Sequence, residues 1–82
     1  MYSVEYTEQS RKFLLKLPKF ESEIIVRKIN SIKKNPFAQV KKLQGIKLWR
    51  LRIGKYRVIL DIIISGNKII VIRIGHRKNV YE

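Results

Sequence analysis

The sequence predicts an α+β domain: an N-terminal strand, a helical hairpin, then a three-stranded antiparallel meander, forming one sheet with the helices on one face. Three observations predict this fold. Residues 2–6 alternate between apolar and polar side chains, residues 8–34 carry apolar side chains at helical spacing, and residues 48–75 alternate again around two glycine-containing turns. With 82 residues and no repeat or linker, we expect residues 1–82 to form a single domain.

The two helices have recognisable ends. Thr7 is the expected N-cap of the first helix, and Glu8 lies in its first turn, where a negative charge is favourable. Pro18 ends that helix or opens the next one, which we expect over residues 19–34, before Pro36. The apolar residues of this second helix form one stripe: Phe20, Ile24, Ile25, Ile29 and Ile32.

The first β-hairpin has a register that its turn defines. Residues 36–46 are expected to be a loop that ends at Gly45. Gly54 and Lys55 then form a two-residue turn with glycine first, which suits a type II′ hairpin and places Arg52 opposite Arg57. One face carries the apolar residues Trp49, Leu51, Ile53, Tyr56, Val58 and Leu60, and the other carries Arg50, Arg52, Arg57 and Asp61.

The second hairpin allows two registers. A two-residue loop sets Leu60 opposite Arg73 and turns Arg73 into the core, where an unpaired charge is costly. A three-residue loop over residues 66–68 sets Asp61 opposite Arg73 instead, because a one-residue slip reverses the faces of the whole strand. We therefore predict the three-residue loop, which also places Arg57 opposite Arg77.

In this register three arginines lie side by side on neighbouring strands: Arg52, Arg57 and Arg77, with Arg50 two residues along. Like charges directly opposite each other destabilise a sheet by about 0.2–1 kcal/mol per pair, so a purely structural surface has little reason to align them. Arginine stays charged and can donate two parallel hydrogen bonds to one phosphate. The row therefore predicts an anion-binding face.

Charge and composition restrict the class of protein. The net charge is +13, and no acidic residue occurs between Ile24 and Leu60. Such a block favours nucleic acid or an acidic protein as partner, although lysines on a helix surface are equally compatible with plain solvation. Cysteine is absent and no cluster of histidines and carboxylates has metal-ligand spacing, so no metal site is expected.

The sequence also bears on localisation. Residues 1–5 lack the pattern of a signal peptide. The apolar runs are far shorter than the roughly 20 residues of a membrane helix. We therefore expect a soluble cytoplasmic protein that does not associate with membranes.

Three stretches together resemble the RelE/ParE toxin superfamily. They are Leu43-Gln44-Gly45, Trp49-Arg50-Leu51-Arg52-Ile53-Gly54-Lys55-Tyr56-Arg57-Val58, and Ile74-Gly75-His76-Arg77-Lys78-Asn79-Val80-Tyr81. The order of one strand, two helices and three strands agrees over essentially the whole chain. The resemblance implies a toxin that cuts mRNA in the ribosomal A site. It also implies a toxin–antitoxin hetero-oligomer in which a small RelB-like antitoxin wraps the toxin with an acidic or amphipathic segment.

The resemblance also implies site residues. In such relatives basic strand residues, two further arginines and a C-terminal tyrosine form the site, and these positions fall here on Arg50, Arg52, Arg57, Arg77 and Tyr81. The 2′-hydroxyl of the RNA would attack the adjacent phosphate, without metal or cofactor, leaving a cyclic phosphate and a 5′-hydroxyl. We expect Arg57 and Arg77 to stabilise the charge that develops on the phosphate, and Tyr81 to stack on a base or take part in proton transfer.

The first strand of this site departs from the RelE pattern. Where the RelE type has lysines, this chain has Arg50 and Arg52. Arginine essentially cannot lose a proton, so we expect these two residues to hold the phosphate and its flanking backbone rather than to act as a general base.

Further residues are expected to contact RNA outside the catalytic site. Lys41, Lys42 and Lys47 would bind ribosomal RNA nonspecifically. His76 is the one histidine of the sequence, and alternation points it away from Arg57 and Arg77. We therefore expect His76 to contact ribosomal RNA or to have a structural role.

Three other functions remain open. The chain can be a ParE-like toxin that inhibits DNA gyrase by binding, an RNA-binding module without chemistry, or an inactive relative that lost both lysines. The arginine row with Tyr81 favours the nuclease. An RNA-binding module would need exposed aromatic side chains on the arginine face, and the strand pattern places none there.

Overall fold

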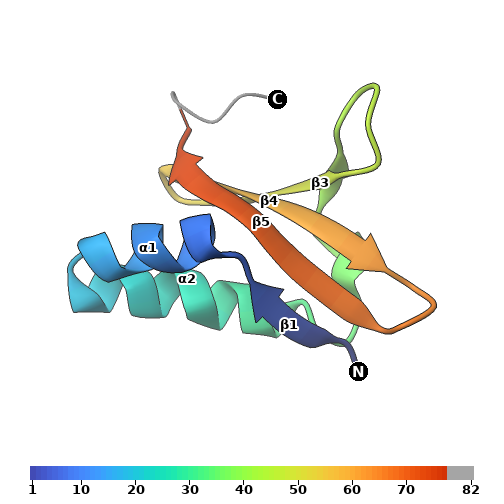
Figure 1. Cartoon of the computed structure of the whole chain (residues 1–82), viewed down its shortest axis with the longest axis horizontal. Coiled ribbons are helices and arrows are strands. Elements are labelled where there is room, and N and C mark those ends of the chain that lie inside the picture. The colour runs from blue at the N-terminus through green and yellow to red at the C-terminus, as the bar shows by residue number, and fades with distance from the viewer. Residues whose placement is uncertain (78–82) are drawn as a thin grey trace.

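A computed structural model describes residues 1–77 of the chain; residues 78–82, among them Tyr81, lie outside the described part. The elements in chain order are β1 (Ser3–Tyr6), α1 (Glu8–Lys16), α2 (Lys19–Ser31), the 3-10 turn η1 (Pro36–Ala38), β2 (Lys41–Lys42), β3 (Trp49–Ile53), β4 (Tyr56–Ile63) and β5 (Lys68–His76). The strands form one sheet in the order β1-β5-β4-β3-β2, and both helices cover the same face of it (Figure 1). The predicted fold class is confirmed.

Two strand pairings were not expected from the sequence. β1 pairs in parallel with β5 at one edge of the sheet, which brings the N-terminal strand beside the last one. β2 pairs with β3 inside the segment that we expected to be loop. Among the described residues, no helix is long and apolar enough to cross a membrane.

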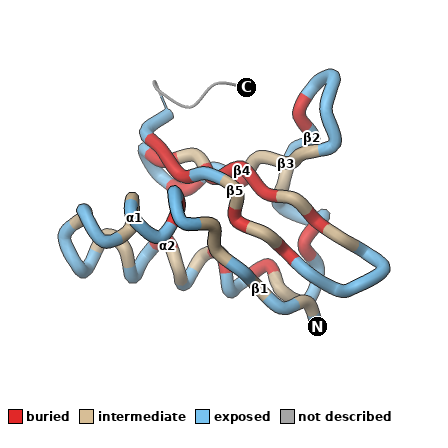
Figure 2. The backbone as a smooth tube through the Cα atoms, viewed as in Figure 1, coloured by how far each residue is buried: buried red, intermediate tan, exposed pale blue. Residues whose placement is uncertain are grey.

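The core lies between the sheet and α2, where the buried positions gather (Figure 2). Ile25, Ile29 and Ile32 of α2 are buried, but Phe20 and Ile24 expose 65% and 47% of their surface. The stripe is therefore buried at Ile25, Ile29 and Ile32, whereas Phe20 and Ile24 lie on its exposed side. A helix turns about 100° per residue, so Ile24 lies about that far around the axis from Ile25. The sheet covers only one part of this wide stripe.

The first β-hairpin has the predicted register. Ile53 lies opposite Tyr56 and Arg52 lies opposite Arg57. Gly54 has a φ of +55°, and Lys55 is not among the residues with positive φ, as a type II′ turn requires. Leu51, Ile53, Tyr56, Val58 and Leu60 are all buried in the core, which confirms the face that the alternation assigned to them.

The predicted register of the second hairpin is wrong. Arg57 lies opposite Gly75 rather than Arg77, and Asp61 lies opposite Ile70 rather than Arg73. The register changes by one residue between Ile59 and Leu60, because β5 contains a β-bulge with one extra residue. Neither predicted loop length anticipates it, since both assume strict alternation along β5.

The bulge determines which residues of β5 face the helices. Val71 and Ile74 both lie in the main core although they are three residues apart. Ile72 packs on the opposite face of the sheet, where Arg73 pairs with Ile59. The bulge therefore keeps Arg73 on the outward face, while Val71 before it and Ile74 after it stay buried in the core.

The start of α1 satisfies the backbone of the bulge. The Thr7 side chain caps α1 by accepting a hydrogen bond from the Ser10 backbone N–H, and its hydroxyl donates to the Ile72 carbonyl at 2.7 Å. The Gln9 side chain accepts from the Ile74 N–H at 3.2 Å and donates to the Ile74 carbonyl at 3.3 Å. These contacts continue the β1–β5 pairing beyond the end of β1, so the backbone groups of β5 keep partners.

Candidate functional site

The arginines predicted to form the site lie on the face of the sheet that the helices leave uncovered. Arg50 and Arg52 alternate along β3 with Leu51 and Ile53, which are buried against the helices. Arg52 lies opposite Arg57 of β4, and Arg57 in turn lies opposite Gly75 of β5. Gly75 is buried and has no side chain, so Arg57 has a guanidinium neighbour on β3 and only backbone beside it on β5.

Arg77 lies one step farther along β5 than predicted. Its backbone N–H donates to the Lys55 carbonyl at 2.8 Å, which places Arg77 beside the β3–β4 turn. Arg57 and Arg77 are thus diagonal rather than direct neighbours, at a spacing of roughly 7–8 Å that long side chains can bridge.

Arg73 is a cation of this face that the sequence did not assign to the site. It pairs with Ile59, which pairs with Arg50 on its other side, so Arg50 and Arg73 flank Ile59 in one row. The neighbouring row contains Arg52, Arg57 and Gly75. The predicted register already placed Arg73 on the outward face, which could have identified it as a site residue. That register paired it with Asp61 and so treated its charge as neutralised. We call the five residues Arg50, Arg52, Arg57, Arg73 and Arg77 the arginine face.

A small apolar cluster supports the middle of the arginine face. Leu43 and Ile59 are buried there, with Leu48 and Ile72 packed against them. The segment between β2 and β3 therefore lies on the side of the sheet opposite the helices and projects away from them (Figure 1). This segment forms a wall at one side of the arginine face.

The predicted RNA-binding lysines lie at different distances from the arginines. Lys41 pairs with Arg50, and the two residues line an open groove of about 350 Å³ together with Arg52, Gln39 and Val40. Lys42 donates a hydrogen bond to the Ile46 carbonyl, and Lys47 is exposed in the same loop. The structure thus brings Lys41 to the arginines and leaves Lys42 and Lys47 on the neighbouring wall.

His76 lies on the other side of the sheet, as alternation predicted. It pairs with Tyr56, with the two ring centroids 5.1 Å apart, and both rings contact Phe13 of α1 edge-on. The Tyr56 hydroxyl donates to a carboxylate oxygen of Glu21 at 2.5 Å, and the Lys55 ammonium lies 3.6 Å from the same oxygen. This cluster anchors the strand ends directly behind Arg57 and Arg77.

The Tyr56–Glu21 hydrogen bond changes the acidity of both groups. Burial and then the hydrogen bond to Glu21 raise the pKa of Tyr56 to about 12. The hydrogen bond from Tyr56 lowers the pKa of the Glu21 carboxyl, and the nearby Lys55 ammonium acts in the same direction. At neutral pH the phenol is therefore protonated and the carboxylate ionised, which is the state that this hydrogen bond requires.

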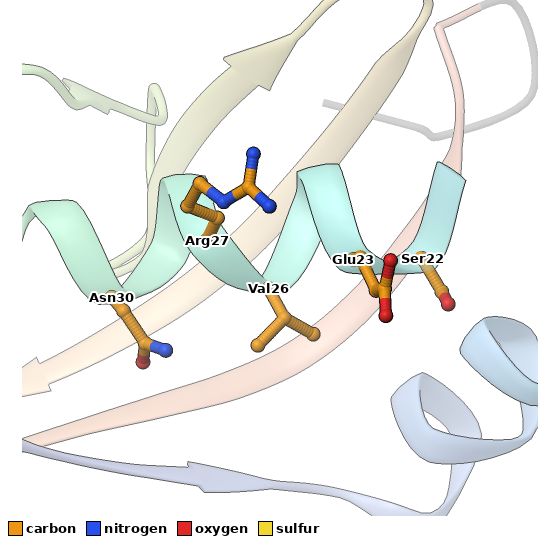
Figure 3. Close-up of a pocket in the computed structure, with 5 residues that line it drawn as sticks. All are labelled: Ser22, Glu23, Val26, Arg27 and Asn30. Atoms are coloured by element: carbon orange, nitrogen blue, oxygen red, sulfur yellow. The ribbon is translucent and has the colours of Figure 1, made fainter. Parts of the chain in front are cut away.

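A hollow on α2 contrasts with the arginine face. It is lined by Ser22, Glu23, Val26, Arg27 and Asn30, and Arg27 points away from Val26 and Asn30 (Figure 3). One acid and one base offset each other in this lining. The arginine face is the better candidate for binding an anion, because its two strand rows place several guanidinium groups together.

Comparisons with known proteins bear on the family and the fold of this chain. A sequence profile of the ParE toxin of type II toxin–antitoxin systems matches residues 4–81. Comparison with curated proteins gave no match.

Among solved structures, the RelBE complex from Mycobacterium tuberculosis superposes with a TM-score of 0.84 at 25% identity, covering 93% of this chain and 98% of that chain. An archaeal RelE–RelB complex from Pyrococcus horikoshii superposes with a TM-score of 0.82 at 27% identity, covering 96% and 98%. The match to the profile over nearly the full length, together with the shared fold, shows that this chain belongs to the ParE toxin family of type II toxin–antitoxin systems, within the RelE/ParE superfamily.

Proposed function

We propose that this toxin is a metal-independent endoribonuclease that cuts mRNA in the ribosomal A site and so inhibits translation. The arginine face is the observation that supports this proposal. Arg52 and Arg57 lie directly opposite each other and Arg77 lies diagonally from Arg57, although this arrangement opposes like charges in the sheet. A phosphate bound between the arginines offsets this repulsion.

The reaction is an attack of the 2′-hydroxyl oxygen of the RNA on the adjacent phosphorus. A new bond forms between O2′ and phosphorus as the 2′-hydroxyl gives its proton to water. The bond between phosphorus and O5′ breaks, and O5′ takes a proton from water and leaves as a 5′-hydroxyl. Negative charge builds on the non-bridging phosphate oxygens, where Arg57 and Arg77 donate hydrogen bonds. Loss of one such preorganised donor typically lowers the rate about 10²–10³-fold.

The other cations position the RNA. Arg50, Arg52 and Arg73 hold the backbone on either side of the scissile phosphate, and Lys41 extends this contact along the groove beside β2. None of the arginines accepts the proton of the 2′-hydroxyl, because guanidinium does not deprotonate in proteins. Tyr81 is proposed to stack on a base or to take part in proton transfer, and it lies outside the described residues.

An acidic antitoxin is the proposed protein partner. Solved relatives with this fold are described as complexes of RelE with RelB. The net charge of +13 favours a partner of opposite charge, and such a pair forms a toxin–antitoxin hetero-oligomer. Ribosomes as the site of action imply a cytoplasmic location.

The decisive experiment adds purified protein to ribosomes stalled on a defined mRNA and maps the new ends. We expect one discrete cut in the A site that depends on the ribosome and disappears in an Arg57→Ala, Arg77→Ala double variant. Arg11→Ala on α1 is the matched control, because it removes an exposed arginine from the helix side. No cut with intact ribosomes at low salt would exclude the nuclease.

Inhibition of DNA gyrase is the second candidate function, and the profile match to ParE favours it. A supercoiling assay with purified gyrase distinguishes the two functions. Inhibition of supercoiling by a protein that leaves mRNA on the ribosome intact would assign the chain to the gyrase-directed branch.

A further inference from the structure

The groove beside β2 opens at the edge of the sheet and has a volume of about 350 Å³. Among the described residues, β2 pairs with β3 at Arg50 and Trp49 alone, so Arg52 lies beyond the paired part of β3. The groove occupies the gap between this part of β3 and the segment before β2. Its lining is Ala38, Gln39, Val40, Lys41, Arg50 and Arg52.

The groove adjoins the proposed cleavage site. Arg52 belongs to both, because it lines the groove and also lies opposite Arg57. Neighbouring strands are about 4.8 Å apart, so the groove lies roughly 5–10 Å from Arg57 across the sheet. This is the range of the next nucleotide along one RNA strand. An RNA with its scissile phosphate at Arg57 therefore brings an adjacent nucleotide to the groove.

The segment that forms the outer wall of the groove is anchored at both ends. Pro36 is buried, and the ring of Phe37 contacts Trp49 edge-on with the centroids 5.1 Å apart. On the other side of Gln39, Val40 packs against the main core. Gln39 therefore extends from a wall whose neighbours are fixed, as in ligand sites that are formed before the ligand binds.

The side chain of Gln39 is oriented from α2. The Lys28 ammonium donates to Gln39 Oε1 at 2.6 Å. Because an ammonium group has donors and no acceptor, the amide must turn its oxygen towards Lys28. The NH₂ end of the amide is therefore directed away from Lys28. The other polar side chains of the lining are those of Lys41, Arg50 and Arg52, which also donate only.

A lining of donors selects a base whose edge carries acceptors. Guanine has two adjacent acceptors, O6 and N7, on one edge, whereas adenine has an amino donor beside N7. We propose that the groove holds the base of a nucleotide next to the scissile phosphate, and that Gln39 makes this base preferentially guanine. Lys28 is a positioning residue that acts through Gln39. This inference rests on the proposed action on RNA and adds a base preference to it.

The test uses uncleavable hexamers of 2′-deoxyadenosine, which lack the attacking hydroxyl. One hexamer contains adenine only, one has a single guanine in the middle, and one has 7-deazaguanine there, which lacks the N7 acceptor. Binding to the purified toxin is measured by fluorescence anisotropy at low salt, where phosphate contacts are strongest. We expect the guanine hexamer to bind at least about fivefold more tightly than the adenine hexamer, and 7-deazaguanine to lose most of this preference.

Matched variants assign the preference to the amide. Gln39→Met keeps the length of the side chain without its donors, and it should bind the guanine and adenine hexamers equally. Lys28→Met should reduce the preference because the amide can then rotate, whereas Lys28→Arg should retain it because a guanidinium group also only donates. The ratio of affinities is the readout, since loss of a charge weakens all hexamers alike.

The control is Gln44→Met, which changes an exposed glutamine that does not line the groove and should leave the preference unchanged. Gln39 is exposed as well, so circular dichroism melts of both variants should match the wild type.

Two outcomes would overturn this inference alone. Equal affinity of the wild type for the guanine and adenine hexamers would show that the groove does not read the base. A preference that persists in Gln39→Met would assign it to the arginines instead. Failure of all three hexamers to bind at low salt would contradict the anion-binding role of the arginine face, and so overturn the proposed function together with this inference.

Discussion

The Gln9 side chain acts as a substitute strand neighbour for β5, and its removal gives a sharp test of how the bulged strand is held. Its amide bonds both the N–H and the carbonyl of Ile74, within β5 between Arg73 and Gly75. Gln9→Ala removes both hydrogen bonds. Each is worth about 0.5–1.5 kcal/mol net, so the free energy of unfolding should fall by about 1–3 kcal/mol. Gln9 is exposed, and water can replace part of the loss, which favours the lower end of this range.

For a domain of this size, 1 kcal/mol corresponds to a change in Tm of about 4–8 °C, so we expect Tm to fall by at least about 4 °C. Thermal unfolding followed by circular dichroism measures this shift, and amide hydrogen exchange at Ile74 should accelerate. Gln44→Ala, in the exposed turn before β3, is the control and should leave both unchanged. An unchanged Tm together with unchanged protection at Ile74 in Gln9→Ala would refute the role assigned to this side chain.

The bulge, the Tyr56–Glu21 hydrogen bond and the arginine face each predict a measurable response. Deleting Ile72 restores regular alternation and keeps the arginines outward, so a cooperative melt should persist with a loss of about 1–2 kcal/mol for one half-buried isoleucine. The raised pKa of Tyr56, about 12, contributes stability that is complete below pH 10 and is lost as the pH rises towards 12. Urea unfolding across this range should therefore show a smaller alkaline loss in Tyr56→Phe. The lowered pKa of Glu21 contributes stability above pH 4.5 that is lost as the pH falls below it, and Glu21→Gln should flatten this acid limb. RNA affinity should fall linearly with salt on a log–log plot, and Arg52→Ala should reduce the slope by about 1.

The parts of the fold that local sequence determines were predictable. The β3–β4 register follows from one two-residue turn, because a glycine at the first turn position and strict alternation leave a single pairing. The N-cap at Thr7 was likewise predicted from residue type alone.

The parts that depend on distant contacts were not predictable. The bulge in β5 is stabilised by Thr7 and Gln9, each 65 residues away along the chain from the residue that it contacts. The alternation of apolar and polar residues within β5 does not reveal such contacts. The same holds for α2, where helical spacing identifies apolar residues but not how much of the helix the sheet covers. Phe20 and Ile24 belong to the predicted stripe, but they are exposed.

The candidate site shows the same division. Arg50, Arg52 and Arg57 were placed correctly on the outward face, because only the first hairpin determines their direction. The direct opposition of Arg57 and Arg77 was wrong, and Arg73 was missed, since both depend on the bulge. The roles of all these residues remain predictions.

A single-turnover cleavage assay on programmed ribosomes asks whether the arginine face stabilises the transition state of mRNA cleavage. We expect Arg57→Ala to lower the cleavage rate about 10²–10³-fold while binding to the ribosome stays close to that of the wild type. The products of the wild type should carry a 2′,3′-cyclic phosphate and a 5′-hydroxyl. Equal cleavage rates for Arg57→Ala and the wild type would show that Arg57 does not stabilise the transition state.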